Sequence, residues 1–224
     1  MRIRNKFALG FFVVLSLIVV FGWPFKSQSE DVAKEDVFSA QVKRIDDNEH
    51  ILFGYPGDEK IILKRKGYVV GYNPEKKVAD WVSYHFTDAY LVKKAARSND
   101  FRPDLDLAPD QRAELKDYRR SGYDMGHLAP AADMTRSKQI MSESFLLFNM
   151  APQVGPGFNR GIWWRILEGK VRDWVRQRRN IYVIDGPIYD GPDGKTIGPD
   201  KVGVPDRFYK IIVSCSEDGG ILTP

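Results

Sequence analysis

The sequence predicts an α+β fold in which a central antiparallel sheet carries helices on both sides. Two apolar runs, residues 68–72 and 78–86, flank the polar turn 73–77, which is typical of a strand, a turn and a strand. A long helix is predicted at 160–179, after the breaker residues 155–157. The chain has 224 residues, 43% of them hydrophobic, which is enough for a substantial core.

The remaining elements follow from local patterns along the chain. The alternation of Val78, Asp80, Val82 and Tyr84 favours a strand buried on one face only. Short helices are predicted at 109–120 and 137–144, and a strand-turn or loop at 122–132. Further strands are predicted at 61–63, 145–148, 180–184 and 208–213, with a loop at 189–200.

The N-terminus carries a targeting segment. Arg2, Arg4 and Lys6 precede the uncharged residues 7–23, which as a helix would span roughly 25 Å. This length fits an uncleaved membrane anchor and a cleaved signal peptide equally well. We therefore expect residues 1–29 to be one of these, 30–60 a linker and lead-in strand, and 61–224 an exported domain. That domain would be periplasmic or secreted, or held at the inner membrane through residues 7–23.

Bulk charge does not identify a partner. The net charge of +4 comes from four basic residues within 1–29, and the rest holds 30 basic and 30 acidic residues. Binding to nucleic acid therefore requires a local patch. The predicted helix 160–179 has seven basic and two acidic residues and is the best candidate, although a solvated helix face is the alternative. Cys215 is the only cysteine, so no intramolecular disulfide can form.

Polar residues capable of phosphodiester chemistry gather around one motif. Residues 121–134 contain Asp124, Gly126 and His127, and Asn159 and Glu168 follow later. A neutral histidine with a pKa near about 6.5 can accept a proton from water. Amide and carboxylate oxygens suit Mg²⁺, which keeps most of its water. The other two histidines, His50 and His85, have no such context and are interpreted as structural.

The order Asp-x-Gly-His, Asn-x-x-Pro-Gln, Asn-x-Gly-x-Trp and Leu-Glu resembles the DNA/RNA non-specific endonucleases. This family has the ββα-metal (His-Me finger) fold and includes secreted bacterial nucleases and mitochondrial endonuclease G. The resemblance runs from residue 67 to the C-terminus. It implies a Mg²⁺-dependent endonuclease, with Mn²⁺ as an alternative ion, acting on DNA and RNA with little sequence selectivity. A homodimer is compatible with it.

The resemblance also implies roles for individual residues. His127 would be the general base, Asn159 the direct metal ligand, and Glu168 the holder of a metal-bound water. Asp124 would fix the loop or orient His127, and Asn149 would support the site. The bland alternatives are a helix N-cap for Asn159, a salt bridge from Glu168 to the residue four positions on, and ordinary turn residues for the others.

Substrate phosphate is expected to contact Arg97, Arg165 and Arg172. The family usually has arginine where this chain has Met125, and Arg120 and Arg136 flank the motif as possible substitutes. Loss of that charge leaves a binding protein without cleavage activity as the main rival. A membrane-anchored interaction module and another phosphoesterase are the others. Family members usually continue beyond residues 221–224, so a truncated C-terminus is also kept open.

Overall fold

The computed structural model describes residues 48–191 and 194–214. The chain divides into two units, residues 1–41 and 42–224, and every described residue belongs to the second. The segment 7–23 and Cys215 lie outside the described residues, so the expectations about them are not tested. Within the described ranges, no helix has both the length and the apolar character needed to cross a bilayer.

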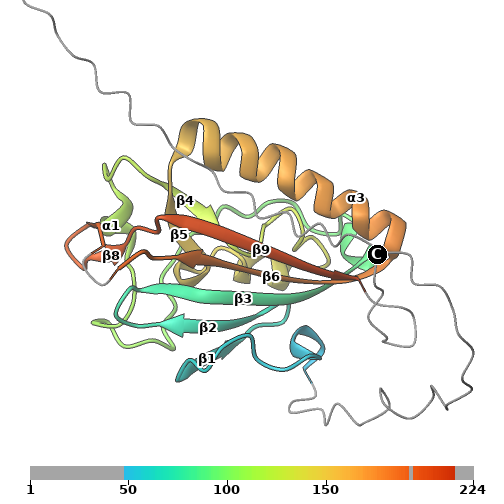
Figure 1. The fold of residues 1–224 in the computed structure, drawn as a ribbon, viewed down its shortest axis with the longest axis horizontal. Helices are drawn as coiled ribbons and strands as arrows, with labels where there is room; N and C mark the ends of the chain where they lie inside the picture. Colours follow the sequence, from blue (N-terminus) through green and yellow to red (C-terminus); the bar gives the residue numbers. More distant parts are fainter. Residues whose placement is uncertain (1–47, 192–193, 215–224) are drawn as a thin grey trace, which may run out of the picture. The chain divides into compact units, whose positions relative to one another are not determined.

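A five-stranded antiparallel sheet forms the framework of this unit, in the order β1–β2–β3–β6–β9 (Figure 1). The predicted strands at 61–63, 68–72, 78–86, 180–184 and 208–213 are all confirmed. Their bounds are β1 (Ile61–Lys64), β2 (Val69–Asn73), β3 (Val78–Thr87), β6 (Asn180–Ile188) and β9 (Arg207–Ser214).

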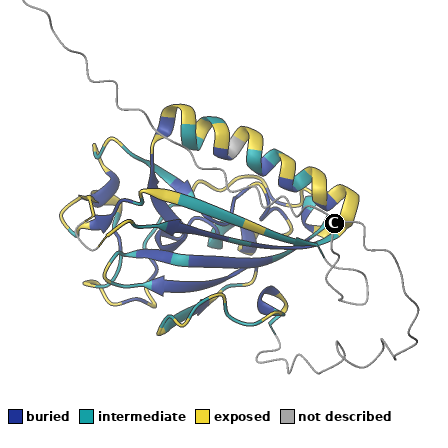
Figure 2. Ribbon diagram, in the orientation of Figure 1, coloured by how far each residue is buried: buried dark blue, intermediate teal, exposed yellow. Residues whose placement is uncertain are grey.

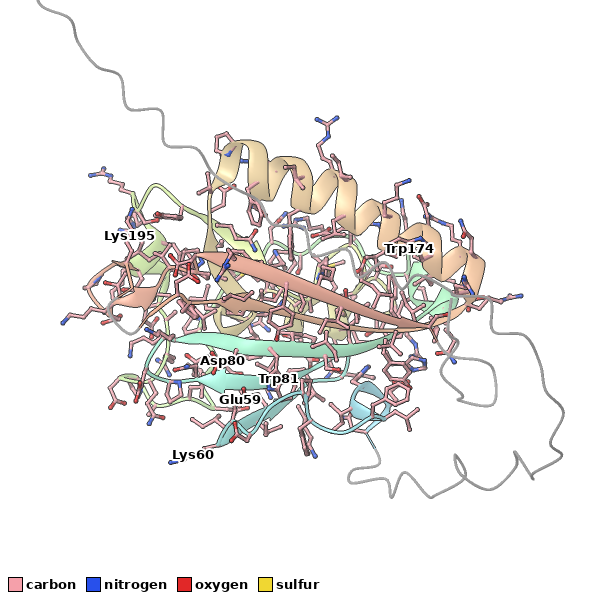
Figure 3. All side chains as sticks on the ribbon, in the orientation of Figure 1. Glu59, Lys60, Asp80, Trp81, Trp174 and Lys195 are labelled. Atoms are coloured by element: carbon pink, nitrogen blue, oxygen red, sulfur yellow. The ribbon has the colours of Figure 1, made fainter. Side chains whose placement is uncertain are left out.

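Strand β3 is buried on both faces, so the prediction of a half-buried strand is wrong (Figure 2). It lies third among the five strands, and both faces of the sheet are covered there. On one face Tyr84 joins the main core. On the other face Trp81 packs with Ile51 and Val69, and its indole N–H donates to the neighbouring Glu59 (Figure 3).

Helices contribute to the covering of both faces, as predicted. Helices α2 (Lys138–Glu143) and α3 (Gly169–Arg178) place Ile140, Val171 and Val175 in the same core as Tyr84. The short helix η1 (Glu49–Ile51) supplies Ile51 on the opposite face. Three short elements complete the helical parts: η2 (Asp88–Leu91), α1 (Leu115–Tyr118) and η3 (Leu147–Asn149). The predicted helix 109–120 is therefore a single turn.

A two-stranded hairpin carries the motif around His127. Strand β4 (Asp124–His127) pairs with β5 (Met150–Gln153), and His127 lies opposite Met150. The predicted strand at 145–148 is wrong, because these buried residues lead into η3 and the next strand begins at Met150. A second small pair, β7 (Thr196–Ile197) and β8 (Val202–Gly203), lies within and just after the predicted loop.

The long helix is confirmed as two continuous segments, η4 (Gly155–Glu168) and α3, which ends at Arg179 in the left-handed conformation. Segment η4 is wound as a π-helix, a rare form that often occurs at functional sites. Trp163 is buried, but Trp174 is 40% exposed, although an apolar stripe shared with Trp163 is predicted to face the core. The wider π-helical turns change the phase between these two residues.

Candidate active site

The residues of the motif meet at a cleft of about 520 Å³. The segment before α1, helix α1, strand β4, the turn after β4 and helix η4 all contribute to its walls. His127, Asp124, Asn159, Glu168 and Arg97 line it together, although they are scattered over more than 70 positions of the sequence. The cleft therefore brings together most of the residues that the sequence singles out.

Close packing within the hairpin explains the glycine before His127. A Cβ atom on Gly126 would lie 2.1 Å from Cδ of Gln153, whose side chain is buried. Gly126 is paired with Ala151, and only a residue without a side chain lets the strands keep this register over Gln153. The glycine thus fixes the position of His127 at the end of β4.

His127 is held between aromatic rings with its Nε2 atom buried. The ring meets Phe145 and Phe101 edge-on, at centroid distances of 4.9 and 5.8 Å. Nε2 has no hydrogen-bond partner among the described residues. Burial, and secondly the positive charge of Arg97, lowers the pKa of His127 to about 3. The imidazole is therefore neutral near pH 7 and able to accept a proton.

Asn149 holds the turn that follows His127 and does not line the cleft. Its Oδ1 accepts from the backbone N–H of Ala129 at 2.9 Å, and its Nδ2 donates to the carbonyls of Ala129 and Ser144 at 3.0 and 2.8 Å. The side chain is fully buried and its hydrogen bonds are satisfied. These contacts make Asn149 a positioning residue for the turn.

Asp124 joins two neighbouring residues of η4 to the hairpin. Its Oδ2 accepts from Nδ2 of Asn159 at 3.0 Å and lies 2.9 Å from Nε of Arg160. No hydrogen bond joins Asp124 to His127, so its contacts favour the loop-fixing alternative. The side chain of Asn159 bonds to Asp124 and does not cap the helix, which removes the N-cap alternative.

Glu168 lies in a buried network of charges below the cleft. Burial, and secondly the charge of Asp133, raises its pKa to about 8. Arg172 lies 3.5 Å from Oε2 of Glu168 and 2.9 Å from Oδ1 of Asp133. The salt bridge that was the bland alternative for Glu168 therefore exists, and Glu168 also reaches the cleft. On the adjacent strands Lys210 pairs with Asp185.

A divalent cation fits this arrangement of donors. Oδ1 of Asn159 has no hydrogen-bond partner among the described residues, because the amide nitrogen makes the printed contact to Asp124. Glu168 belongs to a network in which three carboxyl groups face two cations, so added positive charge would be stabilised there. In the described part of the chain, no three His, Cys, Asp or Glu side chains form a metal cluster. A site with few protein ligands and much water suits Mg²⁺.

The cations are distributed differently from the prediction. Arg97 lines the cleft, with its guanidinium 4.8 Å from the centroid of Phe145. Arg165 is exposed and outside the cleft, and Arg172 is engaged by the buried carboxyl groups. Arg119 and Arg160 line the cleft and were missed, although Arg160 directly follows the predicted metal ligand.

The suggested substitutes for the missing arginine do not reach the cleft. Met125 lines it, and neither Arg120 nor Arg136 does. The guanidinium of Arg136 lies over the ring of Tyr90, 5.2 Å from its centroid. The expectation of a continuous basic surface on helix 160–179 also fails, because four of its seven cations are in ion pairs. His50 and His85 lie outside the cleft in hydrogen-bonded positions, in agreement with a structural role.

Comparisons with known proteins agree with this site. Residues 46–223 match the model of the DNA/RNA non-specific endonuclease family. A nuclease of Syncephalastrum racemosum is 46% identical over 139 residues, 61% of this chain and 43% of that protein. Nuclease C1 of Cunninghamella echinulata var. echinulata is 38% identical over 172 residues, covering 72% of this chain and 68% of its own. Human mitochondrial endonuclease G is 36% identical over 179 residues, 75% of this chain and 59% of its own.

The fold is also similar to a solved structure. The crystal structure of the EndoG/EndoGI complex, described as showing the mechanism of EndoG inhibition, aligns with a TM-score of 0.70 and 37% identity. The alignment covers 77% of this chain and 74% of that one. The chain spans 43–68% of the length of the three relatives above. From its motifs, its hairpin-and-helix site and these matches, the chain belongs to the DNA/RNA non-specific endonuclease family.

Proposed function

We propose that this chain is a metal-dependent endonuclease that hydrolyses phosphodiester bonds in DNA and RNA with little sequence selectivity. The observation that carries the proposal is the meeting, in one cleft, of a neutral His127, the free amide oxygen of Asn159 and the carboxyl group of Glu168. These three groups supply a proton acceptor and oxygen donors for a cation. The named relatives, which are nucleases, support the same activity.

His127 would act as the general base. Its neutral imidazole accepts a proton from water while the water oxygen forms a bond to phosphorus and the ester bond to the leaving sugar oxygen breaks. The rings of Phe101 and Phe145 restrict the imidazole to one orientation. Asn149 contributes by holding the turn after His127 in place.

Asn159 and Glu168 would hold Mg²⁺, with Mn²⁺ as the alternative ion. Oδ1 of Asn159 would bind it directly, and Glu168 would bind through a water molecule. When bound, such an ion supplies positive charge to the phosphate and to the leaving oxygen. Asp124 fixes the Asn159 amide so that its oxygen, and not its nitrogen, is free. Contacts to backbone phosphate rather than to bases would explain low selectivity.

We also propose that the domain acts outside the cytoplasm, because residues 7–23 read as a signal peptide or a membrane anchor. Export would keep a non-selective nuclease away from the DNA of the cell. A homodimer remains a proposal that follows from the resemblance alone.

A second candidate function is a nucleic-acid-binding protein that does not cleave. The position of Met125 favours it, because an uncharged side chain lines the cleft where the family usually has arginine. A missing group that stabilises developing charge can slow turnover by about 10²–10³-fold.

The deciding experiment incubates the purified full-length chain with supercoiled plasmid and with single-stranded RNA, with Mg²⁺, with Mn²⁺ and with EDTA. Cleavage of both polymers that requires the metal is the expected result. Folded protein that binds DNA but leaves it intact with either ion would replace the nuclease by the binding protein.

A further inference from the structure

The wall of the cleft beside β4 lacks the cation that the family usually places there. Met125 lines the cleft, and its side chain packs against the hydrophobic core. Among the described residues, the cations that line the cleft are Arg97, Arg119 and Arg160. The question is which of these stands in for the missing charge.

Arg160 is attached to the same strand as Met125. Its Nε lies 2.9 Å from Oδ2 of Asp124, the residue directly before Met125, and its Nη2 is 3.5 Å from Oδ1. The same Oδ2 accepts from Asn159. Asp124 therefore ties the guanidinium to the proposed metal ligand and to the edge of β4.

Gly155 makes room for this pair. A Cβ atom at that position would lie 2.3 Å from Nη2 of Arg160 and 2.7 Å from Oδ2 of Asp124. Any larger residue would push the guanidinium off the carboxylate or displace the start of η4. The placement of Arg160 thus depends on the local backbone and is more than the chance position of a long side chain.

We propose that Arg160 contacts the phosphate of the substrate and supplies the positive charge that Met125 does not. The inference rests on the nuclease function proposed above. A guanidinium has five N–H donors, and the contacts with Asp124 occupy Nε and Nη2 only in part. The remaining donors are free to take phosphate oxygens in the bidentate manner that arginine favours.

The other two cations are less suited to this role. Arg119 is exposed and makes no ion pair with any described residue, so it would have to be ordered when substrate binds. Arg97 is anchored over Phe145 and through Nε to Asn99, and its charge acts on His127. Arg160 alone of the three is fixed next to both Met125 and Asn159. A donor held in place before the reaction stabilises developing charge best.

The chain offers a matched control for Arg160. The side chain of Arg176 is 59% exposed and pairs with Asp173 at 2.7 Å, whereas that of Arg160 is 60% exposed and pairs with Asp124 at 2.9 Å. Arg176 lies in α3, outside the cleft. The test compares Arg160→Gln, Arg160→Lys and Arg176→Gln with the parent, all as full-length chains, and adds Met125→Arg to the Arg160→Gln chain.

Steady-state cleavage of a defined DNA duplex gives the first readout. We expect Arg160→Gln to lower kcat at least about tenfold, Arg160→Lys less, and Arg176→Gln less than about twofold. Met125→Arg should restore much of the loss in the Arg160→Gln chain. The proposal is overturned if Arg160→Gln keeps the parent kcat, or if Arg160→Gln and Arg160→Lys lose activity equally together with thermal stability. If the double variant does not fold, the comparison of the three single variants still decides.

DNA affinity measured in EDTA against salt concentration gives a readout that does not need cleavage. Removing one phosphate contact should reduce the slope of log affinity against log salt by about one for Arg160→Gln. An unchanged slope contradicts the proposed contact. A parent protein that fails to cleave, together with a reduced slope for Arg160→Gln, would refute the nuclease function and leave the phosphate contact standing.

Discussion

The acid sensitivity of the folded protein should depend strongly on His127. Its pKa is lowered from 6.5 to about 3 in the folded protein, because protonation would place a charge in a buried position. Below pH 6.5 the unfolded chain binds a proton at this residue and the folded protein does not. The contribution of His127 to stability is therefore present above pH 6.5 and is lost as the pH falls toward 3.

The size of the effect follows from the two pKa values. Each unit of pKa difference corresponds to about 1.4 kcal/mol, so going from pH 7 to pH 5 should cost at most about 2 kcal/mol. The ring edge that lines the cleft meets solvent, which reduces the expected value to about 1–2 kcal/mol.

Urea unfolding in EDTA at pH 7 and pH 5, for the parent and for His127→Gln, isolates this contribution, since shifts of all other groups cancel in the difference. The parent should lose more free energy of unfolding than the variant by the amount above. Equal losses, or a larger loss in the variant, would show that His127 protonates in the folded state and would refute the argument from burial.

Two further predictions concern the packing around the site. Gly126→Ala should lower the free energy of unfolding by about 1–3 kcal/mol because its Cβ would collide with Gln153, and Gln153→Ala should relieve most of this cost. Urea unfolding of the two single variants and the double variant measures the coupling, and strictly additive losses would contradict the predicted collision. Asn149→Ala removes three buried hydrogen bonds to Ala129 and Ser144 and should cost about 2–4 kcal/mol. A variant with parental stability in the same assay would show that these bonds are not what holds the turn.

Much of the fold can be predicted from the sequence because the strands and the long helix have strong local patterns. The run 145–148 is different: its four apolar residues are too few to distinguish a strand from other buried backbone, and it leads into a helical turn. Trp174 was misplaced for another reason, since the π-helical winding before it has no local pattern that predicts it.

The site divides in the same way. His127, Asp124, Asn159 and Glu168 are found from spacing and resemblance, and the structure brings them to one cleft. The cations are not predictable in this manner, because their partners lie far away in the sequence. Arg172, for example, is taken up by Asp133, 39 residues earlier, and this contact exists only once the helix packs on the turn after β4.

The most direct test of the central claim is the cleavage rate of His127→Ala at saturating Mg²⁺, compared with His85→Ala and with the parent, while DNA affinity is measured on the same samples. His85 lies outside the cleft, stacked on Tyr182. A general base contributes about 10²–10⁴-fold, so His127→Ala should lose cleavage to that extent, keep DNA affinity, and leave His85→Ala close to the parent. Parental cleavage by His127→Ala would contradict the assignment of the base and, with it, the proposed mechanism.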